Sequence, residues 1–269
     1  MSGVPLGPPA LDALYAAELP QKDELCGAFW GALALRAFGV ASVDGEPLDQ
    51  DLVAVAAGTT RSSGDPARWV PPGAAPRGDH RLPLPLAEDD ATAGSSAPAV
   101  AAAVERLSVG AVSAIPVAGP WSAERVVELL ELLEQLGERS VVVANLHTTP
   151  LWGSHADPAA LVAVLAGEPV QAAPPDWDVG HFVGLGLLVR GPGGALVLVR
   201  DTYRELGNGG YHLQPAGALA AALERGDGAE GGILAFVPSG DAEHVRATLE
   251  EHGFELRHWD NGSVPAAAT

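Results

Sequence analysis

Cys26 is the only cysteine among the 269 residues, and its neighbours suit a nucleophile. The segment Gln21–Trp30 (QKDELCGAFW) places it where an amphipathic helix, expected over 25–38, begins. A thiol in the first turn lies at the positive end of the helix macrodipole, which favours the thiolate. Gly27 leaves room for a substrate backbone. Gln21 could donate a side-chain N–H to an oxyanion, together with the backbone N–H of Cys26. The alternative is a cysteine buried as a small hydrophobic residue.

A thiol nucleophile needs a base, and one of the eight histidines is well placed to act as one. His181 begins an expected hairpin of two strands, 181–189 and 195–200, joined by a Gly-Pro-Gly-Gly turn. Asp201 follows the second strand, so strand pairing would return it beside His181. Its carboxylate could then hold the imidazole in the tautomer that accepts the thiol proton.

The residues at 26–30, Cys-Gly-Ala-Phe-Trp, resemble the nucleophile segment of the papain-like cysteine peptidases, Cys-Gly-(Ser/Ala)-Cys-(Trp/Tyr). Phe29 replaces the second cysteine, which suits an intracellular protein. The chain resembles most closely the bacteriocin-processing (C39-like) leader peptidases, in which a Gln precedes Cys-Gly-Ala and a strand ends in Asp. Four residues separate Gln21 from Cys26, where that family usually has five. His181 lies 155 residues after Cys26, a separation similar to that of papain relatives.

The resemblance implies an α+β, papain-like fold, in which an N-terminal helix carrying the cysteine packs on an antiparallel sheet carrying the histidine. It implies a cysteine-dependent peptidase or amidohydrolase that forms an acyl thioester and needs no metal or organic cofactor. Cys26 would attack, His181 would shuttle the proton, Asp201 would orient the ring and Gln21 would stabilise the oxyanion. By analogy with the Asn of papain, Asn208 is a second candidate for orienting the ring. Substrate contacts are expected from Gly27, Trp30, Gly180, Trp152 and Trp177.

The implied substrate is a peptide or amide, for instance a small ribosomal precursor peptide undergoing maturation. Two alternatives stay open. A papain-like acyl or peptidyl transferase would share the thioester and differ in the acceptor. A catalytically inactive papain-like module would bind a peptide or a protein without turnover.

Composition restricts the partners and the compartment. The chain has 34 Asp and Glu against 15 Lys and Arg, a net charge of −19, which argues against nucleic acid and anionic membranes. Residues 1–9 show no secretory signal, and no apolar stretch is long enough to cross a bilayer. One cysteine fits a reducing cytoplasm and excludes multi-cysteine zinc sites. We therefore predict a soluble cytoplasmic protein, with its oligomeric state left open.

The order of elements, helices first and antiparallel strands later, predicts an α+β class. We expect one domain over 1–269, with a Pro/Gly-rich excursion at 58–98, a short strand at 81–86 within it, and a loose tail at 262–269. His212 should point outward from its strand. Helices are predicted at 10–18, 25–38, 100–107, 122–136, 158–165, 217–224 and 242–252, and strands at 111–117, 140–146, 181–189, 195–200, 211–213, 233–237 and 254–258.

Overall fold

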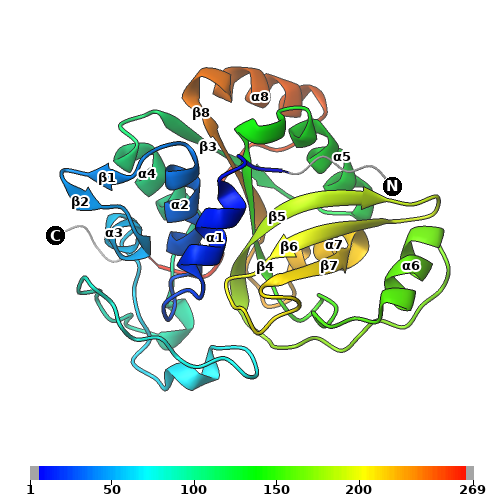
Figure 1. Cartoon of the computed structure of the whole chain (residues 1–269), viewed down its shortest axis with the longest axis horizontal. Helices are drawn as coiled ribbons and strands as arrows, with labels where there is room; N and C mark the ends of the chain where they lie inside the picture. The colour runs from blue at the N-terminus through cyan, green and yellow to red at the C-terminus, as the bar shows by residue number, and fades with distance from the viewer. Residues whose placement is uncertain (1–5, 265–269) are drawn as a thin grey trace.

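The computed structural model describes residues 6–264, in which one six-stranded sheet carries helices on both faces (Figure 1). Every pair of neighbouring strands is antiparallel, so the predicted α+β class is confirmed. Valine, leucine and isoleucine dominate these strands, as buried pleated surfaces require. In sheet order the strands are β3 (Val112–Ala118), β8 (Gly232–Pro238), β4 (Val141–His147), β5 (Gly180–Arg190), β6 (Ala195–Arg200) and β7 (Tyr211–Pro215).

One face of the sheet is covered by four helices, which share a core with it. They are α1 (Leu11–Glu18), α2 (Cys26–Ala37), α3 (Gln50–Ala56) and α4 (Ala97–Leu107). Helix α2 packs tightly on β5: a Cβ at Gly184 would lie 2.2 Å from the Trp30 ring, so only glycine fits. Because α2 and β5 are locked together in this way, the N-terminal end of α2 stays beside the start of β5.

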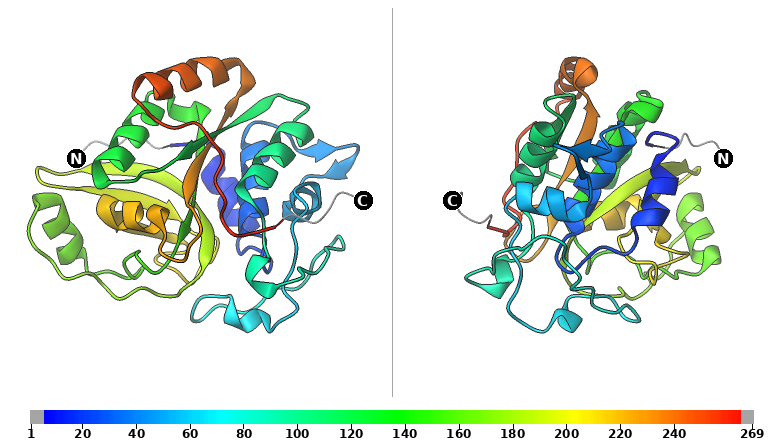
Figure 2. Two further views of the ribbon diagram at one scale, coloured as in Figure 1. Left: turned by 180° about the vertical axis from the view of Figure 1, so that it is seen from behind. Right: turned by 60° about the vertical axis from the view of Figure 1, so that its left-hand side comes forward.

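The opposite face is covered by α5 (Ala123–Glu134), α7 (Ala216–Glu224) and α8 (Ser239–Glu251), which share a second core with the sheet (Figure 2). Helix α6 (Pro158–Ala166) lies beside the turn between β5 and β6, where a Cβ at Gly191 would come within 2.2 Å of the Leu165 carbonyl oxygen. Within residues 6–264 we find no helix with the length and apolarity that a membrane crossing needs.

The excursion at 58–98 has no strand at 81–86, so that prediction is wrong. It contains two short 3-10 helices, η1 (Pro66–Arg68) and η2 (Asp90–Thr92), and an isolated bridge between Arg61 and Leu86. Buried or half-buried carboxylates of the preceding segment hold it in place. Arg77 donates its N–H to Asp23 at 2.7 Å, and Arg81 donates its N–H to Asp51 at 2.7 Å. The excursion is therefore anchored by polar contacts rather than by periodic packing.

The C-terminal segment also differs from the prediction. Instead of a strand at 254–258, one isolated bridge joins Glu255 to Ala118. The described part of the predicted loose tail, 262–264, is tied to the excursion: Ser263 donates to the Ala93 carbonyl at 3.1 Å and Val264 to that of Thr92 at 3.2 Å. Residues 265–269 lie outside the described residues.

Helix α3 and the small hairpin β1 (Ser42–Val43) and β2 (Glu46–Pro47) were not predicted. The remaining predicted helices and strands are present, with ends shifted by three residues or fewer. The local patterns thus locate most elements, whereas the excursion and the C-terminal segment depend on contacts between distant parts of the chain.

Candidate active site

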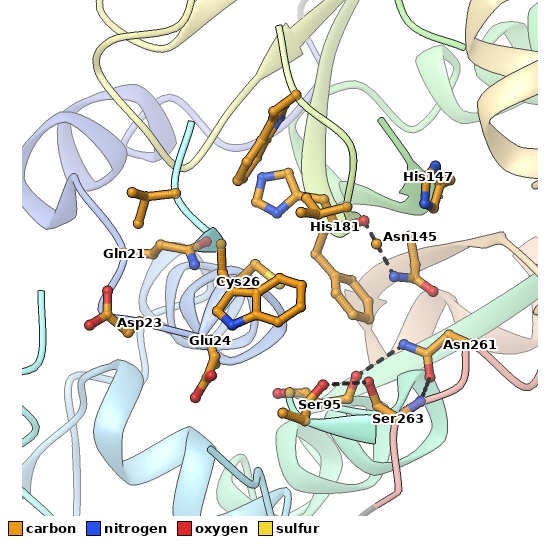
Figure 3. A pocket seen from close by; sticks show the side chains of 18 of the residues that line it. Gln21, Asp23, Glu24, Cys26, Ser95, Asn145, His147, His181, Asn261 and Ser263 are labelled. Carbon is orange, nitrogen blue, oxygen red and sulfur yellow. Dashed lines mark hydrogen bonds between the residues drawn. The ribbon is translucent and has the colours of Figure 1, made fainter. Parts of the chain in front are cut away.

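A pocket of about 310 Å³ opens where the start of α2 meets the start of β5. Its walls come from the chain before α2, the excursion, the end of β4, the start of β5 with the loop before it, and the C-terminal segment. The turn after β6 and the loop after α7 add Tyr203, Arg225 and Asp227. Figure 3 shows the Cys26 side chain between those of Gln21 and His181. The structure therefore brings the predicted nucleophile, base and oxyanion donor into one cavity.

Cys26 is the first residue of α2 and is half-buried. The helix has no side-chain cap: its N-cap residue is Leu25, whose carbonyl accepts the N–H of Phe29 at 2.7 Å. The N–H groups of Cys26, Gly27 and Ala28 belong to the first turn, which lacks intrahelical acceptors. These groups and the helix dipole favour negative charge at this end of α2.

His181 forms an almost fully buried pair with Asp201, in which each residue is 2% exposed. Strand β5 pairs with β6, which brings Asp201, the residue after β6, beside His181. His181 Nε2 lies 3.1 Å from Asp201 Oδ1 and 3.2 Å from the Thr202 hydroxyl. Nδ1 is therefore the ring nitrogen left for the thiol. Asn208 lies in the following turn, where its N–H donates to the Tyr211 carbonyl, so Asp201 rather than Asn208 contacts the ring.

The pair favours its charged form. Burial alone would lower the pKa of His181, but the charge and hydrogen bond of Asp201, followed by those of Cys26, raise it. Burial alone would raise the pKa of Asp201, but His181 and then His212 lower it. A charged imidazolium next to Cys26 stabilises a thiolate by direct Coulomb attraction.

Gln21 is 4% exposed and lines the pocket. Its backbone N–H donates to the Thr202 carbonyl at 3.0 Å, and its Oε1 accepts the Thr202 hydroxyl at 2.5 Å. Because Oε1 is engaged in this way, the side-chain NH₂ group of Gln21 is left for another acceptor. Burial raises the pKa of the Tyr203 hydroxyl, and Gln21 opposes this effect. The one-residue difference in the spacing before Cys26 therefore does not remove Gln21 from the pocket.

Two aromatic rings cover the His181 imidazole. Trp177 meets it edge-on with ring centroids 5.0 Å apart, and Tyr203 lies nearly parallel to it at 6.3 Å. Trp177 was among the predicted substrate contacts, whereas Tyr203 was not singled out by the sequence. Both rings line the pocket, and they shield the buried pair from solvent.

The predicted substrate contacts divide into two groups. Gly180 and Trp177 line the pocket, whereas Gly27, Trp30 and Trp152 lie outside its lining. A Cβ at Gly27 would approach Val100, Ser95 and Phe182 at 3.0 to 3.2 Å, so this glycine serves helix packing. Trp30 is fully buried in the core, and the backbone of Trp152 is bound by the side chain of Gln214. The expected substrate contacts of Gly27 and Trp30 are therefore corrected, whereas that of Trp152, which is half-buried outside this pocket, stays a prediction.

Asn145 is a pocket residue that the sequence prediction missed. Its Nδ2 donates to the His181 carbonyl at 3.3 Å, and its Oδ1 accepts the Trp259 indole N–H at 3.0 Å. It thus fixes the backbone of the residue that carries the imidazole. The only signal in the sequence was a polar residue within the buried run of β4.

A second group of charges lies at the far side of Gly180. His147 Nε2 is 3.4 Å from Asp178 and 3.8 Å from Asp227, and Arg225 pairs with Asp227. All four line the pocket. His155, the other histidine of this region, is exposed. No group of three or more His, Cys, Asp and Glu side chains within residues 6–264 is arranged to hold a metal ion.

His212 also departs from the prediction. It is 6% exposed rather than outward-facing, and its Nε2 lies 3.7 Å from Asp201 Oδ2. The short strand pattern at 211–213 did not reveal which face would be buried, because both faces of β7 are partly covered.

Comparison with curated proteins gives no match. A family does match, over residues 6–260, which include every residue of the pocket except Asn261 and Ser263. The chain belongs to this family, which is described as a family of unknown function (DUF6885).

Proposed function

We propose that this protein is a papain-like, cysteine-dependent peptidase or amidohydrolase that works through an acyl thioester. One observation carries the proposal: Cys26, at the start of a helix, shares a pocket with His181, whose far ring nitrogen is 3.1 Å from the buried Asp201. Nucleophile, base and orienting carboxylate in this order form the arrangement that activates a thiol. The resemblance of residues 21–30 and 180–201 to leader peptidases supports the same assignment.

In the first half of the reaction, His181 Nδ1 takes the Cys26 proton and the thiolate attacks the substrate carbonyl carbon, forming a C–S bond. The carbonyl oxygen gains negative charge, which the Cys26 N–H and the Gln21 side-chain NH₂ would stabilise. The tetrahedral intermediate then expels the amine. His181 returns its proton to that nitrogen as the C–N bond breaks, leaving the acyl group on sulfur.

In the second half, His181 takes a proton from water, and the resulting hydroxide attacks the thioester carbonyl. Collapse of this intermediate breaks the C–S bond, releases the carboxylic acid and restores the thiol after His181 returns the proton. Asp201 stays ionised throughout and holds the ring so that Nδ1 faces the sulfur.

The excursion contributes apolar lining residues that include Pro66, Trp69 and Val70, the loop before β5 contributes Trp177, and β5 contributes Phe182. We propose a peptide or amide substrate lying against these residues. By resemblance, a small ribosomal precursor peptide processed in the cytoplasm is the substrate class to test first.

The test is acylation of Cys26 by a small activated ester, p-nitrophenyl acetate, followed by acid quench and mass mapping of the modified residue. We expect Cys26 to be acylated and then to deacylate, no adduct at position 26 in Cys26→Ser, and acylation slowed by about 10²- to 10⁴-fold in His181→Ala. His252→Ala, which changes an exposed histidine paired with Glu128, is the matched control.

The alternatives appear as separate outcomes. Equal, slow acylation in the wild type and His181→Ala would contradict the proposal and favour a binding module. Normal acylation with transfer of the acyl group to an added amine in preference to water would favour the transferase.

A further inference from the structure

We propose that His212 is a positioning residue, whose Nε2–H is directed at the Asp201 carboxylate and through it fixes the orientation and charge of His181. The inference rests on the proposed function in that it takes His181 as the base. It concerns a residue outside the pocket lining, so it is separable from substrate recognition.

The register of two strands brings His212 to Asp201. Strand β7 pairs with β6 so that His212 lies opposite Val199. Residues two apart on a strand share a face, which places Asp201 on the same face as Val199 and His212. The Asp201 N–H donates to the Gly210 carbonyl at 2.7 Å, which holds this register just past the end of β6.

The hydrogen bonds of Gln214 determine which nitrogen of the His212 ring carries the proton, because two of its partners are backbone groups that can only donate or only accept. Gln214 Oε1 accepts the Trp152 N–H at 2.8 Å, and Gln214 Nε2 donates to the Trp152 carbonyl at 2.8 Å. These contacts orient the amide without ambiguity. Its second N–H points to His212 Nδ1, 2.9 Å away, which must act as the acceptor. The proton of a neutral ring is therefore on Nε2, the nitrogen that faces Asp201.

The Asp201 carboxylate uses its two oxygens differently. Oδ1 lies 3.1 Å from His181 Nε2 and accepts the Thr202 N–H at 2.7 Å. Oδ2 faces His212 Nε2 at 3.7 Å, longer than a hydrogen bond, so this contact is electrostatic at the observed separation. His212 Nε2 is buried and has no hydrogen-bond partner among the described residues. A buried donor without an acceptor is costly, and Asp201 is the acceptor it faces.

Other polar groups around Asp201 do not replace this donor. The Tyr15 hydroxyl of α1 donates to the Asp201 backbone carbonyl, and Arg200 is paired with Asp12. The Tyr203 hydroxyl and the Cys26 thiol lie on the pocket side of His181. Without His212, the carboxylate would lose the dipole that faces Oδ2. Asp201 would then stabilise the charged His181 ring less and hold its orientation less firmly.

The experiment is a ¹⁵N NMR titration of the His181 ring in a Cys26→Ser background, which removes the reactive thiol. His212→Phe removes the donor, His212→Gln keeps an N–H that can reach Asp201, and His252→Phe is the control at an exposed histidine. We expect His212→Phe to lower the His181 titration midpoint by about 1 pH unit, a tenfold change in the protonation constant. His212→Gln should keep the His181 midpoint close to that of the parent protein, and the control should leave the midpoint unchanged.

An unchanged midpoint in a folded His212→Phe protein would overturn the inference and leave His212 as a packing residue. A second check uses the wild-type protein, so it does not depend on whether a variant folds. The ring ¹⁵N shifts of His212 should report the Nε2–H tautomer, and the Nδ1–H tautomer would also overturn the inference. Cys26 alkylation, measured in the wild type that retains the thiol, separates the two proposals. An ordinary, unreactive thiol would contradict the proposed function without changing the His181 titration in the Cys26→Ser background.

Discussion

Two histidines, His181 and His147, line the same pocket, and each is paired with a carboxylate in different surroundings. His181 lies 3.1 Å from Asp201, with both side chains 2% exposed, whereas His147 lies 3.4 Å from Asp178, with side chains 17% and 77% exposed. The pairs contain the same chemical groups at similar distances. Burial and fixed partners, rather than composition, therefore distinguish the pair we assign to catalysis.

The physical difference lies in the solvent. Water screens the exposed pair of His147 and Asp178, so removing either side chain should change the free energy of folding very little. Each member of the buried pair has lost its hydration, so its charge depends on the other member. Thr202 and His212 add fixed dipoles around Asp201, whereas Asp178 accepts from the exposed Thr149 hydroxyl at 2.7 Å. The following predictions test this contrast.

The largest difference is expected between the two histidines. His181→Ala should reduce Cys26 acylation by about 10²- to 10⁴-fold, because the thiol loses its base. His147→Ala should stay within about threefold of the wild type, since its contacts are exposed. Acylation rates of both variants with the same activated ester give the comparison. Equal losses would show that the pocket responds to either pair.

The carboxylates should differ in their effect on stability. Asp201→Asn breaks the buried pair and should lower the free energy of unfolding by about 3 to 5 kcal/mol at pH 6, whereas Asp178→Asn should change it by less than about 0.5 kcal/mol. Urea denaturation of the two variants measures both values. A small loss in Asp201→Asn would indicate that the pair is not ionised.

The pH dependence of that difference has a definite sign. The lowered pKa of Asp201 contributes stability above about pH 3.9 that is lost as pH falls through its folded pKa. The raised pKa of His181 contributes stability below about pH 6.5 that is lost as pH rises through its folded pKa. The destabilisation by Asp201→Asn should therefore be greatest between about pH 4 and 6.5. Denaturation across pH checks this, and a maximum in alkaline solution would contradict it.

Glu24 shows what burial does to a carboxyl without a histidine beside it. Burial raises its pKa to about 7, although its carboxylate accepts the Ser62 N–H at 2.8 Å. The folded state keeps a proton that the unfolded state releases, so stability should fall as pH rises from about 4.5 to 7. Glu24→Gln should remove this fall. Because the carboxyl is partly solvated, we expect a gain of at most about 1 kcal/mol at pH 8, measured by thermal denaturation.

Salt should produce the smallest effect. Raising NaCl from about 0.05 to 1 M shortens the screening length to about 3 Å, which weakens exposed pairs more than buried ones. The destabilisation by Asp201→Asn should change by less than about 0.5 kcal/mol over this range. Any contribution of the Asp178 carboxylate to the free energy of unfolding should vanish at the higher NaCl concentration. Parallel urea curves at the two salt concentrations provide the check.

The sequence was sufficient for the parts of the site that depend on local pattern. Cys26 at a helix start and Asp201 after a hairpin strand follow from periodicity and turn residues, and the structure places both as those patterns predict. The position of Gln21 before Cys26 suggested an oxyanion donor, and the resemblance to leader peptidases supported that role although the spacing differs by one residue.

The remaining parts depend on contacts that local pattern does not encode. The turn 202–210 sets the register that brings His212 to Asp201, and no periodicity specifies its length. The excursion is held by Asp23, Asp51 and Glu24, and the sequence analysis assigned none of these carboxylates a role. Helix α3 was a missed local signal, because Asp49 caps it by accepting the Leu52 N–H at 2.9 Å.

The most direct test of the central claim is the rate of Cys26 alkylation by iodoacetamide across pH, in the wild type and in His181→Ala. An ordinary cysteine thiol loses its proton near pH 8.5, so its alkylation rate falls tenfold per unit below about that pH. The account predicts that wild-type Cys26 keeps reacting rapidly well below this value and that His181→Ala removes the excess. An ordinary titration that is indifferent to His181 would contradict the account and leave Cys26 as a structural thiol.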